Sequence, residues 1–158
     1  TAAFTTLPYH EIAFRVLSKY TDGIVPSDAL ATICRAAYDF AVPLEKVYDR
    51  VHVMRLDQGP TASFKDFAAR MMARLMSAFS DPGKRLNVLV ATSGDTGSAV
   101  GEAFKGVEGI DVTILYPRGE VSGRQKGSYA QVHLRLIDGI MLHLQEEMVY
   151  FMPILMVY

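Results

Sequence analysis

The stretch that decides the fold is Arg85–Phe104, "RLNVLVATSGDTGSAVGEAF". Its apolar run "RLNVLVA" predicts a buried strand, and small residues follow from Ser93 to Ala99. The segment "GSAVGEAFKG" then predicts a short helix, and "IDVTILYPRG" predicts the next strand. A strand, a tight turn, a helix and a second strand make a βαβ unit, which joins two parallel strands. We therefore predict an α/β fold of three layers, with a parallel sheet and flanking helices.

The remaining sequence divides into segments of different character. Residues 1–50 predict a helical N-terminal segment, since "PYHEIAFRVLSKY" and "PSDALATICRAAYDF" repeat apolar residues at helical spacing. Residues 51–83 predict a strand, at about 50–56, and then an amphipathic helix in "SFKDFAARMMARLMSAF". Residues 84–139 form the βαβ small domain, with a further strand in "VHLRLID". Residues 140–158 are an apolar tail that we leave unassigned, and its abrupt apolar end leads us to expect a truncated domain.

Composition excludes several classes of function. The 158 residues carry a net charge of −1 and no basic cluster, so we expect no nucleic-acid partner. No signal peptide and no apolar run long enough to cross a membrane is present, so we expect no membrane partner. The single cysteine, Cys34, lies on the apolar side of a predicted helix and fits a buried thiol in a reducing, cytoplasmic compartment. The histidines are scattered, and we expect no metal site.

The small-residue turn after the strand is suited to an anion. Ligands of open α/β sheets lie at the carboxyl ends of strands, where a helix N-terminus presents N–H groups and a favourable dipole. The turn is neither the dinucleotide fingerprint nor a P-loop, because the glycine spacing and the Gly-Lys-Ser/Thr ending are absent. "DTGS" matches aspartic proteases, but those enzymes are all-β. A carboxylate or phosphate site and a simple packing turn both stay open for this segment.

Lys65 is a second candidate for chemistry, besides the small-residue turn. It lies in the first turn of the amphipathic helix, which Ser63 or Thr61 can cap and where Asp66 suits the helix dipole. A helix N-terminus and burial both disfavour a lysine's charge, and a neutral amine is what Schiff-base chemistry requires. The alternative is a surface lysine that extends into solvent, paired with Asp66 or another acid.

The two segments together resemble a known family. The order "GPTASFKDFAARMMARLM", "VLVATSGDTGSAVGEAFKG" and "ILYPRGEVSGRQ" is similar to that of the threonine synthases, over roughly residues 8–139. Related dehydratases and cysteine synthases usually have Asn at the position of Asp95, so this Asp and "YPRG" favour threonine synthase. The resemblance implies a tryptophan-synthase-β-like fold, here incomplete, and pyridoxal 5'-phosphate as cofactor. The family's reaction converts O-phosphohomoserine and water to threonine and phosphate.

The resemblance also implies residue roles. Lys65 would bind the cofactor covalently and move protons, as the catalytic residue. The turn that receives the substrate carboxylate would comprise Ser93, Gly94, Asp95, Thr96 and Gly97. Asp95 would also face the cofactor's ring oxygen, where its negative charge requires protonation or a nearby donor.

The sequence departs from the family in places. Gln58 stands where the family often has His, and the resemblance ends after Gly139. The family's loop for the cofactor phosphate lies further downstream, so we expect this chain alone to bind cofactor weakly or not at all. Two alternatives follow: another pyridoxal-phosphate dehydratase or β-replacement enzyme of related fold, or an inactive, truncated interaction module. The sequence does not indicate an oligomeric state.

Overall fold

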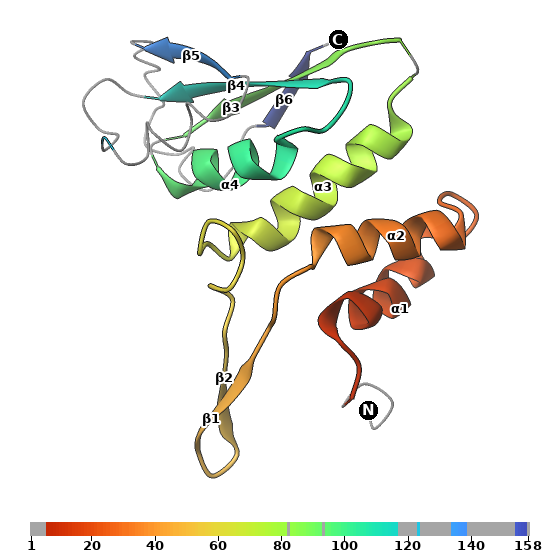
Figure 1. Ribbon diagram of the computed structural model, residues 1–158, viewed down its shortest axis with the longest axis vertical. Helices are drawn as coiled ribbons and strands as arrows, with labels where there is room; N and C mark the ends of the chain where they lie inside the picture. Colours follow the sequence, from red (N-terminus) through yellow and green to blue (C-terminus); the bar gives the residue numbers. More distant parts are fainter. Residues whose placement is uncertain are drawn as a thin grey trace. The chain divides into compact units, whose positions relative to one another are not determined.

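The computed structural model describes residues 6–81, 83–92, 94–116, 123, 134–138 and 154–157. The chain divides into two compact units, Thr1–Leu75 and Met76–Tyr158, and helix α3, Lys65–Phe79, crosses the boundary (Figure 1). Each unit is considered by itself below. The four-segment division of the sequence stays a prediction.

The first unit contains helices α1 (Tyr9–Thr21) and α2 (Ser27–Ala37) and a β-hairpin. Strands β1 (Leu44–Tyr48) and β2 (Val51–Met54) pair antiparallel. The predicted helical segment is thus wrong beyond Ala37, whereas β2 lies within the predicted strand at 50–56. Pro43 explains the error, because proline has no N–H for a helix and disfavours helical backbone at the residue before it.

The core of the first unit is apolar and rich in aromatic rings. Leu30, Cys34, Ala37, Tyr38 and Met71 are buried at its centre. Around them, edge-to-face contacts join Tyr9 to Tyr38 and Phe67, and Phe40 to Phe67, with ring centroids 5.0 to 5.4 Å apart. Cys34 is fully buried, as predicted, and burial raises the pKa of its thiol.

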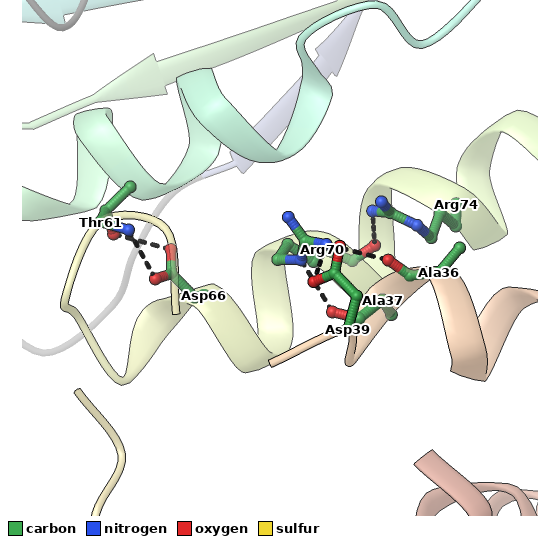
Figure 2. Close-up of polar contacts among 7 residues, drawn as sticks. All are labelled: Ala36, Ala37, Asp39, Thr61, Asp66, Arg70 and Arg74. Atoms are coloured by element: carbon green, nitrogen blue, oxygen red, sulfur yellow. Dashed lines mark hydrogen bonds and ion pairs between the residues drawn. The ribbon is translucent and has the colours of Figure 1, made fainter. Parts of the chain in front are cut away.

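Arg70 of α3 joins this helix to the end of α2. Although it is charged, it is only 7% exposed. Its Nε donates to the Ala37 carbonyl at 2.7 Å, and its Nη2 donates to the Ala36 carbonyl at 2.9 Å and to Asp39 Oδ1 at 2.7 Å (Figure 2). A cation at a helix C-terminus also interacts favourably with the helix dipole. The guanidinium therefore satisfies carbonyls of the last turn of α2 that the helix cannot bond itself.

The second unit is the predicted α/β element. Its sheet has the order β5-β4-β3-β6, with β3 at Leu86–Ala91, β4 at Ile110–Tyr116, β5 at Leu134–Asp138 and β6 at Ile154–Val157. Strands β3, β4 and β5 are parallel, and β6 pairs antiparallel with β3. Helix α4, Asp95–Phe104, lies along one face of the sheet and buries four apolar side chains: Ala99, Val100, Ala103 and Phe104. The predicted α/β class and the parallel βαβ pairing are confirmed.

Strand β6 belongs to the apolar tail that the sequence left unassigned. Its four residues form backbone pairs with Asn87–Val90 of β3. Being antiparallel, it departs from the purely parallel sheet that the βαβ pattern predicts. The sequence also predicts a short helix in "VSGRQKGSYAQ", a segment that falls outside the described residues except for Gly123. In the described part of the chain, no helix is long and apolar enough to cross a membrane.

Arg70 gives a first prediction about stability. Replacing it (Arg70→Ala) removes three hydrogen bonds and exposes unpaired carbonyls at the end of α2, which should lower the free energy of unfolding by about 2–4 kcal/mol. Urea titration followed by circular dichroism measures this. Lys84→Ala is the control, because its ion pair with Asp81 is exposed and should contribute less than about 1 kcal/mol. A loss in Arg70→Ala no larger than the control's would contradict the assignment.

Tyr38 gives a prediction about alkaline pH. Burial, with smaller contributions from Tyr9 and Cys34, raises the pKa of Tyr38 from 10.0 to about 12. Between these values the unfolded chain loses the phenol proton and the folded chain keeps it, so stability falls as pH rises from about 10 to 12. Below pH 10 both states keep the proton, so this group adds no pH dependence to the stability. Thermal unfolding from pH 8 to 12 should show a shallower decline in Tyr38→Phe than in the wild type, and equal slopes would refute the prediction.

Candidate functional site

Lys65 is the first residue of α3 and is half-buried. Its Nζ lies 4.8 Å from the centroid of the Phe64 ring, which is itself 62% exposed. Among the described residues, no carboxylate lies within ion-pair distance of this amine, so the predicted alternative of a pair with Asp66 is not observed. The amine is thus held by an aromatic ring and not neutralised by an acid.

Asp66 instead bonds the turn that precedes α3. Thr61 donates its backbone N–H to Asp66 Oδ2 at 2.9 Å and its hydroxyl to Oδ1 at 2.7 Å (Figure 2). The carboxylate is 1% exposed, so these hydrogen bonds are its compensation for burial. The predicted capping by Thr61 therefore has the opposite direction: the helix residue accepts and the turn residue donates.

The backbone of the turn is tightly constrained before it reaches Lys65. The Ala62 N–H donates to the Gly59 carbonyl at 3.0 Å, and Ala62 has φ of 55°, in the left-handed region. That conformation costs about 1–2 kcal/mol for a residue with a Cβ. Ser63 then bonds the helix start, because its Oγ accepts the Lys65 N–H at 3.3 Å and its carbonyl accepts the Asp66 N–H at 3.0 Å.

Gly59 is required by the close approach of Asp66. A Cβ at residue 59 would lie 2.8 Å from Asp66 Cβ and 3.0 Å from its Cγ, and closer still to Oδ2. Carbon atoms do not approach to these distances, so a side chain here would displace the carboxylate from Thr61.

The small-residue turn of the second unit begins its helix earlier than predicted. We predicted a helix that begins at Gly97, but α4 starts at Asp95, with Gly94 as its N-cap. Small residues favoured a loop in the sequence analysis. However, the acidic Asp95 suits the first turn of a helix, where it interacts favourably with the helix dipole. The predicted site residue Ser93 lies outside the described residues.

The geometry of this turn depends on Thr92, which the sequence analysis missed. Its hydroxyl oxygen accepts the Gly94 N–H at 3.1 Å, and its own N–H donates to the Leu115 carbonyl of β4 at 2.9 Å. A threonine before a glycine-rich turn is the signal that identifies such a bond. Of the predicted residues, Asp95 is exposed, Gly94 and Thr96 are half-buried, and Gly97 is buried with its N–H donating to the Gly94 carbonyl at 3.1 Å.

The predicted site residues belong to two units. Lys65 lies in the first unit, and Gly94–Gly97 lie in the second. Within the part that the structure describes, no three His, Cys, Asp or Glu side chains gather as metal ligands. The carboxylate-binding role of the turn stays a prediction.

Comparison with known proteins decides the family. The threonine synthase of Haemophilus influenzae is 43% identical over 120 residues, which are 76% of this chain and 28% of that protein. The Escherichia coli threonine synthase is 40% identical over 112 residues. The chain belongs to the threonine synthase family. No family-specific sequence profile matches it.

Solved threonine synthases share its structure. The Brucella melitensis threonine synthase, determined with pyridoxal phosphate bound, superposes with a TM-score of 0.75 at 35% identity. The Escherichia coli enzyme superposes with a TM-score of 0.72 at 34% identity. Each match covers 84% of this chain and 31% of the solved threonine synthase chain. The chain therefore corresponds to the N-terminal part of these enzymes and spans under a third of their length.

The glycine beside Asp66 gives a prediction for this threonine synthase segment. Gly59→Ala should lower the free energy of unfolding by about 1–3 kcal/mol, since the new methyl group displaces a buried carboxylate from its donors. Urea unfolding measures the loss. Gly23→Ala is a control for backbone effects: Gly23 has φ of 75°, and an added Cβ there would meet no atom within 4 Å. A loss in Gly59→Ala smaller than in Gly23→Ala would show that the predicted overlap is absent.

Proposed function

We propose that the protein acts as a threonine synthase, converting O-phosphohomoserine and water to threonine and phosphate with pyridoxal 5'-phosphate. The observation that carries the proposal is the family match over the segment that contains Lys65, an amine that no acid among the described residues neutralises. The solved Brucella melitensis relative binds the same cofactor. We also propose a reducing cytoplasmic location, which the single buried thiol of Cys34 supports.

The residues present fit the cofactor at Lys65. A primary amine can react with an aldehyde only when it is unprotonated and sterically accessible, and the half-buried Lys65 amine is not engaged by an acid in the described structure. When bound, pyridoxal phosphate supplies an electron sink that stabilises negative charge at the substrate's carbons. Lys65 would hold the cofactor through its Nζ and later accept and donate protons at that atom.

The turn at the start of α4 would hold the substrate carboxylate. It lies at the carboxyl end of β3, and the N-terminus of α4 favours a negative charge there. The backbone N–H groups of Gly94 and Gly97 already have acceptors within the turn, on Thr92 and Gly94 respectively. These bonds hold the turn in its conformation and already engage these two N–H groups. Asp95 is exposed in the same helical turn, so its charge would compete with a bound carboxylate for the same dipole.

Peptide mapping after borohydride reduction tests the cofactor site. With excess pyridoxal phosphate, reduction of the full-length protein should label Lys65 before Lys84, whose side chain is 74% exposed and which serves as the reference amine. Lys65→Ala should lose the visible absorption band and this early label, whereas Lys84→Ala should keep both. If Lys65 is labelled no faster than Lys84, the proposed cofactor role is wrong.

The reaction is tested by its products. Phosphate release from O-phosphohomoserine by the full-length protein supports threonine synthase. Ammonia release from threonine would instead support the alternative of a fold-related dehydratase. Neither product, with intact cofactor binding, would reject both enzymatic assignments.

A further inference from the structure

We propose that Asp66 is a positioning residue that fixes the turn Gly59–Phe64 and thereby places the amine of Lys65; the role of that amine rests on the proposed function. The two hydrogen bonds from Thr61 to the carboxylate of Asp66 are called the Thr61–Asp66 clasp below. The clasp closes the turn onto the first turn of α3, one residue beyond Lys65.

In the clasp a single residue, Thr61, donates a hydrogen bond to each oxygen of the Asp66 carboxylate. The Thr61 N–H and hydroxyl bind Oδ2 and Oδ1 at 2.9 and 2.7 Å, and the carboxylate is almost completely removed from solvent. A buried carboxylate without donors is costly, so opening the turn carries a large penalty. Gly59 supplies the space that Asp66 needs, which shows that the turn and the carboxylate fit closely.

The turn transmits this constraint to Lys65 through Ala62 and Ser63. Ala62 is held in a left-handed conformation that an unconstrained alanine would leave. Ser63 follows directly and binds the N–H of Lys65 through its Oγ. Release of Thr61 would let Ala62 relax, move Ser63 from the helix start and free the first residue of α3 to fray. The position of Nζ therefore depends on a carboxylate that does not contact it.

If Asp66 only stabilised the first unit as a whole, its loss would act like the loss of Arg70 and would not loosen the turn selectively. Arg70 stabilises the same helix through α2 but lies four residues further along and bonds no residue of the turn. Loss of Arg70 should weaken the unit as a whole. Loss of the clasp should loosen the turn selectively, and Arg70→Ala is therefore the matched control.

Proteolysis tests the clasp without any cofactor. Chymotrypsin can cleave after Phe64, an exposed aromatic residue in the turn, and after Tyr48 in the hairpin as an internal reference. We expect the ratio of these rates to rise about tenfold in Thr61→Val, which loses one hydrogen bond to a charged group. Asp66→Asn should raise it similarly, because its amide cannot accept at both positions. Thr61→Ser keeps both donors and, like Arg70→Ala, should leave the ratio unchanged.

Labelling of Lys65 gives the second measurement. In the full-length protein, the ratio of borohydride-fixed cofactor at Lys65 to that at Lys84 should fall about tenfold in Thr61→Val, because one hydrogen bond to a charged group is lost. The ratio should recover in Thr61→Ser. Wild-type ratios in Thr61→Val, for both cleavage and labelling, would overturn the proposal. If wild-type Lys65 is labelled no faster than Lys84, the proposed function fails. The ratio of cleavage after Phe64 to cleavage after Tyr48 then tests the clasp by itself. If Asp66→Asn does not fold, the comparison of Thr61→Val with Thr61→Ser decides.

Discussion

Two buried charges of opposite sign, on one helix, hold the first unit together. Asp66 and Arg70 are one helical turn apart in α3, and both are almost fully removed from solvent. Neither charge neutralises the other; each obtains its hydrogen bonds from a different part of the chain (Figure 2). Asp66 binds Thr61 before the helix, and Arg70 binds the last carbonyls of α2 together with Asp39. Because a buried charge without partners is costly, both connections must form when α3 packs.

This arrangement leaves the lysine's amine without an acid partner in the described structure. Asp66 follows Lys65 directly in sequence, yet its two oxygens are occupied by Thr61. The turn before Lys65 is thus fixed by hydrogen bonds to Asp66, while the Lys65 amine lies over the Phe64 ring. The cofactor role proposed for Lys65 rests on the family match, and the local geometry shows how its backbone is positioned.

The sequence predicted the elements that depend on apolar pattern and on turn chemistry. Strands β3 and β4 and their parallel pairing follow from two apolar runs separated by a helix that starts with small residues. The sequence failed where charges are buried, because apolar periodicity treats Asp66 and Arg70 as the solvated face of α3. The carbonyls that Arg70 binds lie more than thirty positions earlier, and no local pattern identifies them. Thr61 was expected only as a cap whose oxygen accepts, whereas it donates to Asp66. The hairpin was missed because the helical interpretation was extended across Pro43.

The central claim is that a buried carboxylate holds the lysine-bearing turn. Residue-resolved hydrogen exchange of the Thr61 amide in the wild-type chain tests it most directly, since that N–H donates to Asp66. We predict exchange at least about a hundredfold slower than in an unstructured peptide, because opening requires an unpaired buried charge. Exchange of the Thr61 amide at the unstructured rate, in a chain whose α3 amides remain protected, would contradict the account.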